Sequence, residues 1–420
     1  MTELRFLHIS TFYPPYSFGG DAVYLQRLAH LLGDCGHQVD VVYCRDSFHL
    51  FHPGQPSSAA EDHPNVHRHE LRSPLGPLSP LVSHQTGFPL LQQRKIRELT
   101  EAHEYDVIHV HNGSLFGPGL WDLPARGNPV RFYTAHEHWL VCPTHVLLKY
   151  DGNVCAEPEC LKCTLKHKRP PQLWRYTGLF ERKAKFIDQF FSPSQFTVEE
   201  HAKRGFSRKM ECLPYFMAEQ DEDWQNPAPR PQERPYYLFV GRLEHLKGVQ
   251  ELIAVWDQVP DVDLLIAGDG DYAPELKRLA NGNRRIRFLG RVSQPELGPL
   301  YHHALACVVP SITYETFGIV CIEAFARKTP VIVHDLGGLS EVAEQSHGGL
   351  TYRNRQELID ALRVLADVPA WRRELGENGY AAFRRNWTPE AHLEHYYSWI
   401  NKFRPELKLR TRPLSCDAIS

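Results

Sequence analysis

The sequence predicts an α/β protein with two Rossmann-like, doubly wound domains that face a cleft. The chain has 420 residues, more than one ordinary hydrophobic core accommodates, so two domains are expected. Short apolar segments alternate with amphipathic segments in both halves, which is the pattern of parallel strands connected by helices. The alternation stops in an acidic, proline-rich stretch over 218–235 and begins again at Tyr236. This stretch is therefore interpreted as a linker between two domains.

The first domain is predicted over 1–217. Its first strand is followed by a loop that ends in the pair Gly19 and Gly20 and by an amphipathic helix over 21–36, as at the start of a Rossmann-like unit. Paired glycines let the backbone approach a ligand closely, although an ordinary strand-to-helix turn explains them as well. Strands are predicted over 4–9, 39–44, 66–70, 107–110, 130–134, 190–194 and 209–213, with helices over 21–36 and 90–103 and another that ends near 205. The stretch 47–89 is interpreted as an irregular excursion that carries substrate contacts.

The second domain is predicted over 236–385. Strands are predicted over 236–240, 263–267, 287–289, 305–309 and 331–333, with helices from there to 385. The last helix lies in 386–403, and 404–420 is interpreted as a loose tail. Gly268 and Gly270 follow the second of these strands and, like the first glycine pair, permit a close approach of the backbone to a ligand.

The most informative stretch, 310–326, reads P-S-I-T-Y-E-T-F-G-I-V-C-I-E-A-F-A. A polar loop follows a buried strand, and a helix is predicted from Phe317 onward. The first turn of a helix suits a phosphate, and Thr316 is a candidate cap. Glu315 in the loop and Glu323 on the helix can accept hydrogen bonds from sugar hydroxyls. A nucleotide sugar needs both features, whereas a plain strand–helix unit with an acid on a solvated face is the alternative.

Two cations follow the first strand of the second domain. The segment 241–249 reads G-R-L-E-H-L-K-G-V and places Arg242 and Lys247 at a glycine-bounded turn. A departing diphosphate that has no metal ion beside it needs such cations to neutralise its charge. The alternative interpretation is two exposed basic residues.

Glu315 and Glu323 have seven residues between them, and in this context they resemble the E-x7-E motif of retaining glycosyltransferases of family 4, which have the GT-B fold. The flanking residues that fit are Pro310, Ser311, Thr316, Phe317, Gly318, Ala324 and Ala326. The resemblance covers about 1–403 and is strongest from 236 to 338. It implies that the last helix crosses back to the first domain.

The resemblance also implies roles for single residues. Arg242 and Lys247 would contact the donor diphosphate, Glu315 the hydroxyls of the donor sugar, and Glu323 the ribose hydroxyls. Further donor contacts are implied at Gly19, Gly20, Gly268, Gly270, Arg291, Val292, Thr316, Phe317 and Gly318. No residue stands out as a covalent nucleophile.

Histidines follow two of the predicted strands. His136 comes directly after 130–134, in T-A-H-E-H-W, at the strand end where open α/β sheets bind ligands. A satisfied loop histidine is an equal alternative on physical grounds. The stretch resembles the family's T-x-H-[DE] segment, with Glu137 in place of the commoner Asp, which implies that His136 approaches the donor sugar. The pair His109 and His111 is interpreted as a strand end at the ligand face, because no third metal ligand lies nearby in sequence.

Four of the ten cysteines lie in the loop 142–163: Cys142, Cys155, Cys160 and Cys163. Four thiols at this spacing, ending in C-x2-C, suit a tetrahedral structural zinc. Two disulfides or unligated thiols are the alternatives, and a reducing cytosol argues against disulfides. Zinc would order the loop and is not expected to act in catalysis, which requires no cofactor.

The segment 161–187 combines basic and aromatic residues. Trp174, Phe180 and 183–187 suggest a helix with one apolar side, which could lie on an anionic membrane surface. A helix that packs on the core and exposes a basic face is the commoner arrangement.

Bulk composition narrows the functional classes. The net charge of −3 argues against a nucleic-acid-binding protein. No run of 18 or more apolar residues is present, so no membrane-spanning helix is expected. Glu3 and Arg5 lie where a signal peptide would be apolar, so a cytoplasmic protein is expected, with contact at the inner face of the membrane as the alternative.

The sequence therefore predicts a retaining glycosyltransferase in glycan, polysaccharide or glycolipid biosynthesis. The donor is expected to carry UDP or GDP, and the acceptor to be a glycan, a lipid-linked acceptor or a small molecule. A nucleotide-sugar epimerase, a phosphorylase and a non-catalytic binding protein remain as alternatives.

Overall fold

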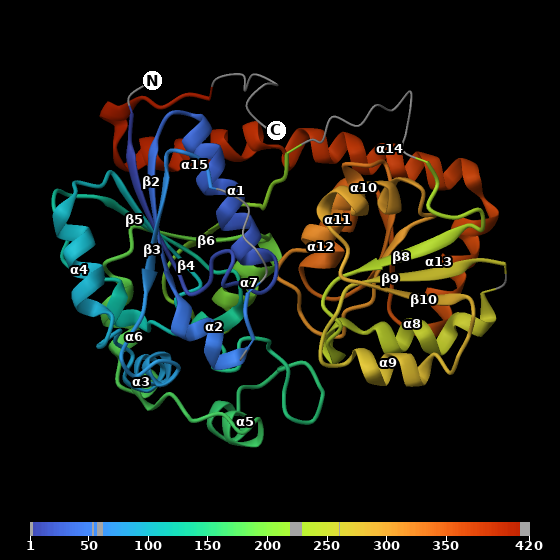
Figure 1. The fold of residues 1–420 in the computed structure, drawn as a ribbon, viewed down its shortest axis with the longest axis horizontal. Helices are drawn as coiled ribbons and strands as arrows, with labels where there is room; N and C mark the ends of the chain where they lie inside the picture. The colour runs from blue at the N-terminus through green and yellow to red at the C-terminus, as the bar shows by residue number, and fades with distance from the viewer. Residues whose placement is uncertain (1–2, 53, 57–61, 219–228, 260, 412–420) are drawn as a thin grey trace. The chain divides into compact units, whose positions relative to one another are not determined.

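The computed structural model describes residues 3–52, 54–56, 62–218, 229–259 and 261–411. The chain forms two compact units. One contains the described residues up to Leu213 together with those from His392 onward, and the other runs from Pro214 to Ala391. Each unit has a wholly parallel sheet that carries helices (Figure 1). The predicted α/β class with two Rossmann-like domains is confirmed, and most of the predicted linker lies outside the described residues.

The first unit contains a seven-stranded sheet of order β3-β2-β1-β4-β5-β6-β7. Its strands are β1 (Arg5–Ser10), β2 (Gln38–Cys44), β3 (Val66–Leu71), β4 (Val107–His111), β5 (Val130–Thr134), β6 (Gln189–Ser192) and β7 (Met210–Cys212). Its helices before the C-terminal one are α1 (Gly20–Asp34), α2 (Arg45–Phe51), α3 (Leu78–Thr86), α4 (Gln93–Ala102), α5 (Cys160–Lys166), α6 (Leu179–Ala184) and α7 (Gln195–Lys203). Three single turns of 3-10 helix accompany them, η1 (Pro118–Leu120), η2 (His138–Leu140) and η3 (Leu173–Tyr176).

The second unit contains a six-stranded sheet of order β10-β9-β8-β11-β12-β13. Its strands are β8 (Tyr236–Val240), β9 (Asp263–Ala267), β10 (Ile286–Gly290), β11 (Cys307–Val309), β12 (Val331–His334) and β13 (Gly349–Tyr352). Its helices are α8 (Val249–Val255), α9 (Ala273–Leu279), α10 (Gln294–His302), α11 (Ile319–Phe325), α12 (Gly338–Ser346), α13 (Arg355–Asp367) and α14 (Pro369–Asn386), with the 3-10 turns η4 (His245–Lys247) and η5 (Trp256–Gln258).

Both sheets reverse their direction of growth beside their first strand. In the first unit the chain adds β2 and β3 on one side of β1 and then continues with β4 on the other. In the second unit it adds β9 and β10 on one side of β8 and then continues with β11. Figure 1 shows α8 and α9 on one face of the second sheet and α10, α11 and α12 on the other. Such reversals are where open α/β sheets bind ligands, at the carboxyl ends of the strands.

The stretch 47–89 is less irregular than predicted, because α2 and α3 lie in or across it. These helices are stabilised by tertiary contacts that the sequence pattern does not indicate. Phe48 of α2 stacks on Phe18 with ring centroids 4.8 Å apart, and the indole of Trp174 donates a 2.9 Å hydrogen bond to the carbonyl of His84 in α3. The edge strand β13 was also not predicted, because its sequence, G-L-T-Y, contains little apolar signal.

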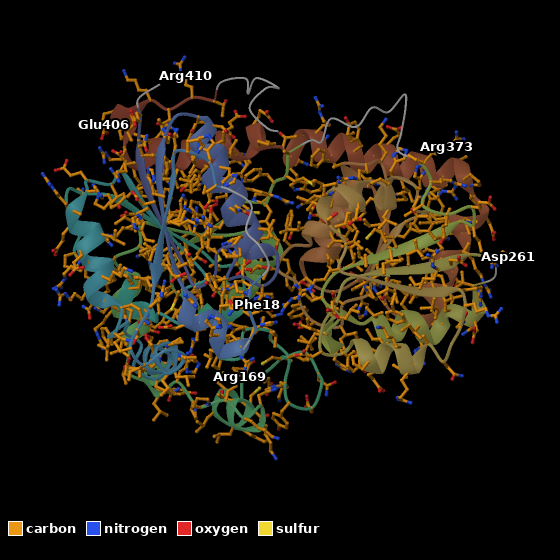
Figure 2. All side chains as sticks on the ribbon, viewed as in Figure 1. Phe18, Arg169, Asp261, Arg373, Glu406 and Arg410 are labelled. Atoms are coloured by element: carbon orange, nitrogen blue, oxygen red, sulfur yellow. The ribbon has the colours of Figure 1, made fainter. Side chains whose placement is uncertain are left out.

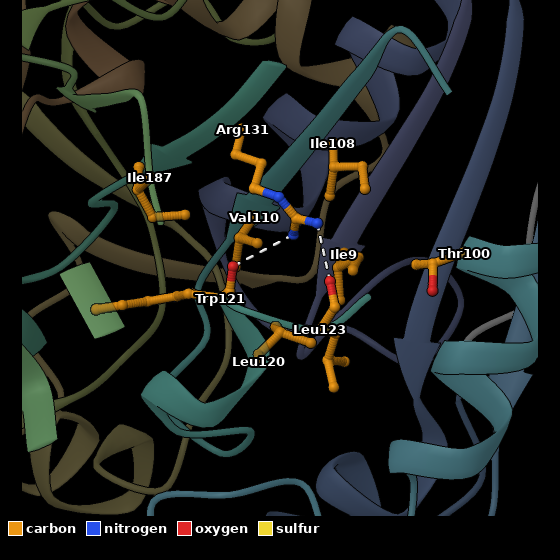
Figure 3. Close-up of a pocket in the computed structure, with 9 residues that line it drawn as sticks. All are labelled: Ile9, Thr100, Ile108, Val110, Leu120, Trp121, Leu123, Arg131 and Ile187. Atoms are coloured by element: carbon orange, nitrogen blue, oxygen red, sulfur yellow. Dashed lines mark hydrogen bonds between the residues drawn. The ribbon is translucent and has the colours of Figure 1, made fainter. Parts of the chain in front are cut away.

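A half-buried arginine fixes the loop after β4 in the first unit. Arg131 of β5 donates hydrogen bonds to the carbonyl oxygens of Trp121, at 3.2 Å, and Leu123, at 2.8 Å (Figure 3). It lines a cavity of about 10 Å³ whose other walls are almost entirely apolar. A space of this size holds at most one water molecule, so this cavity cannot be a substrate site.

The last helix, α15 (Pro389–Phe403), enters the first unit at His392 and is held there by hydrogen bonds between buried rings. The hydroxyl of Tyr396 lies 3.0 Å from Nδ1 of His109, and that of Tyr397 lies 2.8 Å from Nε2 of His37. The described part of the predicted tail is also attached, because Leu409 is buried and exchanges two hydrogen bonds with the Asn401 side chain.

Candidate active site

Two loops meet at the reversal point of the second sheet, one after β8 and one after β11. The ammonium of Lys247 in the first loop lies 2.7 Å from Oε1 of Glu315 in the second. The Ser311 hydroxyl donates to the same oxygen at 2.8 Å. Of the predicted site residues, Lys247 and Glu315 are therefore in direct contact, at the edge of the sheet where the topology places a ligand.

The Glu315 carboxylate keeps its negative charge. Burial alone would raise its pKa, but the charge of Lys247, the hydrogen bonds from Lys247 and Ser311 and the charge of Arg242 together lower it. Arg242 itself is half exposed and pairs with Glu244 at 2.6 Å. The site thus presents a partly exposed carboxylate between two cations, an arrangement that can contact both a sugar hydroxyl and an anionic phosphate.

Glycines permit these loops to pack backbone against backbone. A Cβ atom on Gly248 would lie 1.8 Å from the carbonyl oxygen of Pro310. The predicted donor-binding residues Gly268 and Gly270 show the same constraint, because a Cβ on them would lie 1.9 Å from the Gly241 oxygen and 2.5 Å from the Leu243 oxygen, respectively. The structure therefore gives these glycines a role in loop packing, whatever ligand they contact.

Sequence reasoning missed the role of Gly337 and Gly338, which follow β12. The Gly338 amide donates to the carbonyl of Glu315 at 2.8 Å, and Gly337, at φ 76°, forms a parallel bridge with Glu315. A Cβ atom on Gly338 would lie 2.7 Å from the Thr316 oxygen. The glycine pair after a predicted strand was the signal that could have identified them.

The helix after Glu315 begins later than predicted. It starts at Ile319, and Gly318, with φ 116°, is its N-cap residue without a side-chain cap, so the prediction that Thr316 caps the helix is wrong. The helix has only seven residues, and its dipole is correspondingly small. Phe317 is buried against Tyr215, with ring centroids 5.2 Å apart.

Glu323 differs from Glu315 in its surroundings. It is buried on α11, and its Oε2 accepts a 2.9 Å hydrogen bond from the hydroxyl of Tyr301 in α10. Burial, and then the charge of Glu323, raises the pKa of Tyr301, so the phenol retains the proton that it donates. Tyr301 is a further residue that sequence reasoning did not find, since nothing in the sequence pairs α10 with α11.

The predicted donor contacts Arg291 and Val292 follow β10. Gly290, with φ 72°, closes a bulge in this strand, and its carbonyl accepts a hydrogen bond from the Gly268 amide at 2.7 Å. Arg291 is exposed and Val292 half-buried beyond it. The loops after β9 and β10 are therefore joined at the same edge of the sheet as Lys247.

In the first unit, Gly19 and Gly20 start α1 beside the corresponding reversal point. Gly19 is the N-cap residue, with φ 74°, and Asp21 in the first turn accepts a 2.9 Å hydrogen bond from Asn112, which follows β4. Thr11 donates to the Asn112 carbonyl. The loops after β1 and β4 are thus connected to each other, as those after β8 and β11 are.

A chain of buried histidines leads to His136. Nδ1 of His8 lies 2.9 Å from Nε2 of His111, and Nδ1 of His111 lies 3.0 Å from Nε2 of His136. Among the described residues, Nε2 of His8 has no hydrogen-bond partner. A bare lone pair is less costly there than a buried N–H without an acceptor, so each proton belongs on Nδ1. His136 then presents an Nδ1–H group as a donor.

A third histidine, distant in sequence, joins the pair His109 and His111, because the parallel register places His8 of β1 directly opposite His109 of β4. The candidate ligand atoms of His8, His109 and His111 lie within 4.8 Å of one another. These rings nevertheless bond to each other, to Tyr396 and to Thr134. The groups whose charge acts on His109 and His111 are other histidines, which cannot compensate a buried divalent cation.

The remaining predictions concern the loop 142–163 and the segment after it. All four of the loop's cysteines are free and line one small cavity. The segment 161–187 is not one amphipathic helix, because it contains α5, η3 and α6 with irregular stretches between them. Trp174 and Phe180 are buried in the core. Within the described residues, no helix is both long enough and apolar enough to cross a bilayer.

We predict that acid destabilises the first unit through these histidines. Burial lowers the pKa of His8 and of His136 to about 3 and holds those of His109 and His111 well below their usual value. The unfolded chain protonates histidine near pH 6.5, so unfolding takes up protons below that pH. The free energy of unfolding should be constant above about pH 7 and fall by about 1.4 kcal/mol per pH unit for each such histidine as the pH decreases towards 4.

Urea unfolding at pH 7.5, 6.0 and 5.0 measures this dependence. In His8→Leu, unfolding should take up one proton fewer, so the unfolding free energy should depend less steeply on pH. His67→Gln, at an exposed position on β3, should show the pH dependence of the parent protein. Equal stability at pH 7.5 and 5.0 would contradict the prediction.

Two family models match the chain, one for each half. The model described as Glycosyltransferase Family 4 matches residues 18–216, and the one described as Glycosyl transferases group 1 matches residues 220–382. A glycogen synthase of Mycobacterium tuberculosis is 38% identical over 157 residues, which cover 35% of this chain and 38% of that protein. The match thus spans less than half of the length of this relative.

Solved structures extend the likeness in fold to nearly the whole chain. Sucrose-phosphate synthase from Thermosynechococcus elongatus has a TM-score of 0.73 and 24% identity, with 96% of this chain and 100% of that chain covered. An Anabaena protein in complex with UDP and glucose has a TM-score of 0.64 and 18% identity, with coverages of 96% and 99%. Since both halves match glycosyltransferase models in the expected order and the fold neighbours have the GT-B fold, the chain belongs to the family 4, or group 1, glycosyltransferases.

Proposed function

We propose that the protein transfers a sugar from a nucleoside diphosphate sugar to an acceptor hydroxyl and retains the anomeric configuration. The observation that carries the proposal is the contact between Lys247 and Glu315, at 2.7 Å, at the reversal point of the second sheet. It places a cation suited to a phosphate beside a carboxylate suited to a sugar. The family matches of both halves support the same reaction class.

In the proposed reaction the bond between the anomeric carbon and the diphosphate oxygen breaks, and its electron pair leaves with the diphosphate. The acceptor oxygen forms the new bond, and its proton passes to the departing phosphate. Arg242 and Lys247 stabilise the charge that develops on the leaving group. The short helix α11 contributes less, so the two cations supply most of this stabilisation.

We assign the other donor contacts by the same reasoning. Glu315 would bind hydroxyls of the transferred sugar with the oxygen lone pairs that Lys247 and Ser311 leave free. Glu323, held by Tyr301, would bind the ribose. His136 would donate its Nδ1–H to the sugar as a neutral ring. The Anabaena fold neighbour, whose structure contains UDP and glucose, supports UDP as the first nucleotide to test.

The donor is identified by a thermal-shift screen of the full chain against UDP, GDP, ADP, CDP, TDP and their common sugars. A ligand that binds the folded state raises the melting temperature in a dose-dependent manner, so one nucleotide should stand out. Glu323→Gln should abolish its shift, because the amide cannot accept both hydrogen bonds of a ribose diol. Glu374→Gln, at an exposed position on α14, serves as the matched control. No shift with any nucleotide would contradict the proposed donor class.

Turnover with the identified donor tests the two cations. Arg242→Ala and Lys247→Ala should each lower kcat by about 100-fold, the typical effect of removing one preorganised charge-stabilising group. Arg278→Ala, which removes an exposed cation paired with Glu275 on α9, should remain near the parent rate. Near-normal rates in both site variants would contradict the assignment of Arg242 and Lys247 to the diphosphate. Release of an altered sugar without any acceptor would instead favour an epimerase.

We also propose that the segment 161–187 contacts an anionic membrane at its surface. Five large apolar side chains of this segment are 48–66% exposed: Leu161, Leu165, Leu173, Tyr176 and Phe186. Lysines and arginines lie among them, which suits anionic lipid headgroups. The protein should float with vesicles that contain anionic lipid and less so after Leu173→Ser and Tyr176→Ser. Equal recovery with neutral vesicles would rule out this charge-dependent contact.

A further inference from the structure

The loop 142–163 brings four cysteines from three separate stretches to one place. Cys142 follows η2, Cys155 follows a tight turn, and Cys160 and Cys163 lie in the first turn of α5. All four line a single cavity of about 20 Å³, which is close to the space that one small ion or water occupies. None of them forms a disulfide. The cysteines belong to the first unit and are therefore a separate site from Lys247 and Glu315, which lie in the second unit.

The chemistry of this donor set selects the ligand. Thiolates are soft ligands, and four of them with a terminal C-x2-C on a helix start are typical of tetrahedral structural zinc. The four sulfurs line the cavity, but they lie farther apart than the ligand atoms of His8, His109 and His111, which are within 4.8 Å of one another. The sulfurs would therefore move inward when an ion binds. We propose that Cys142, Cys155, Cys160 and Cys163 bind one zinc ion as thiolates and release their protons to solvent.

Three cations lie at or beside the cavity, and they differ in whether a carboxylate already pairs with them. Zinc with four thiolates has a net charge of −2, which nearby cations or solvent must balance. Arg175 donates to the carbonyls of Trp139, at 2.7 Å, and Leu140, just before Cys142. Within the described part of the chain, Arg175 forms no ion pair with a carboxylate. Arg204 donates to the Cys155 carbonyl at 2.6 Å but is paired with Glu200, and Lys149 lines the cavity but is paired with Glu159, which lines it too. Arg175 is therefore the cation of the three that is left to balance the charge.

The other contacts of the loop are mostly local. Its turn is closed by hydrogen bonds from the Lys149 amide to the Asn153 carbonyl and from the Cys155 amide to the Leu147 carbonyl. Arg169, labelled in Figure 2, ties the chain after α5 back to the Thr144 carbonyl at 3.3 Å. A bound ion would join these local contacts into one unit.

The loop is also continuous with the segment that carries His136. The Cys142 amide donates to the His138 carbonyl at 2.8 Å, and the His138 amide donates to the His145 carbonyl at 3.1 Å. His145 in turn contacts the Glu137 carboxylate at 2.8 Å. An ion held by Cys142 would therefore fix the segment 136–145, without touching the reacting groups.

Metal analysis of the full chain, purified without chelator, tests the proposal. We expect one zinc per chain, and the chelator-treated protein should regain one zinc or one cobalt ion, with the cobalt form showing thiolate-to-metal charge-transfer absorption. Metal removal should lower the melting temperature by roughly 5–10 °C, the change expected for loss of a ligand held at about a thousand times its dissociation constant.

Variants locate the ion. Cys160→Ser combined with Cys163→Ser should lose the zinc, and Cys212→Ser, outside the loop, should keep it. His109→Gln tests the alternative that the ion lies at the buried histidines. An ion that is lost in this variant and kept in the double cysteine variant would lie there and would overturn the proposal. A parent protein that neither contains zinc nor takes up zinc or cobalt after purification under reducing conditions would overturn it as well.

Discussion

The contact between the loops after β8 and β11 is the constraint on which the candidate donor site depends. Because Gly248 has no side chain, its backbone can meet the Pro310 carbonyl, where a Cβ atom would lie only 1.8 Å away. This approach sets the distance at which Lys247 reaches Glu315. Gly338 fixes the same loop from its other side, through a 2.8 Å hydrogen bond to the Glu315 carbonyl. The charged groups therefore owe their geometry to the neighbouring backbone, and preorganised charges of this kind lose little energy to reorganisation when a leaving group departs.

The two units stabilise their ligand edges by different physical means. The second unit uses charge: the carboxylate of Glu315 stays ionised because Lys247 and Ser311 offset the effect of burial on its pKa. The first unit uses neutral rings, since burial keeps His111 and His136 uncharged. A neutral imidazole can orient a sugar hydroxyl without attracting the diphosphate, whereas the cations of the second unit are suited to bind it. The proposed division of roles follows from this difference in electrostatics.

Sequence reasoning located what repeats along the chain and missed what only the tertiary structure brings together. Most strands were found to within a few residues because most are short apolar runs, and the fold class followed, whereas the edge strand β13 was missed. The Lys247–Glu315 region was found through local motifs. Tyr301, however, reaches Glu323 only because α10 packs beside α11, and His8 joins His109 only because β1 pairs with β4 in a particular register. Neither contact can be predicted from the residues that are close to it in the sequence.

The position of His136 is determined from two directions. On one side, the Nδ1–H of His111 donates to Nε2 of His136 at 3.0 Å, and His111 is itself held by His8, which fixes the ring and its tautomer. On the other side, the segment that follows bends back through the hydrogen bond between Cys142 and His138 into the cysteine loop. A histidine that must present one N–H group in one direction needs both constraints, because the ring hydrogen bond fixes its rotation and the loop fixes its backbone. The chain thus supports its one predicted catalytic histidine with a buried hydrogen-bonded relay on one side and a cysteine-lined loop on the other.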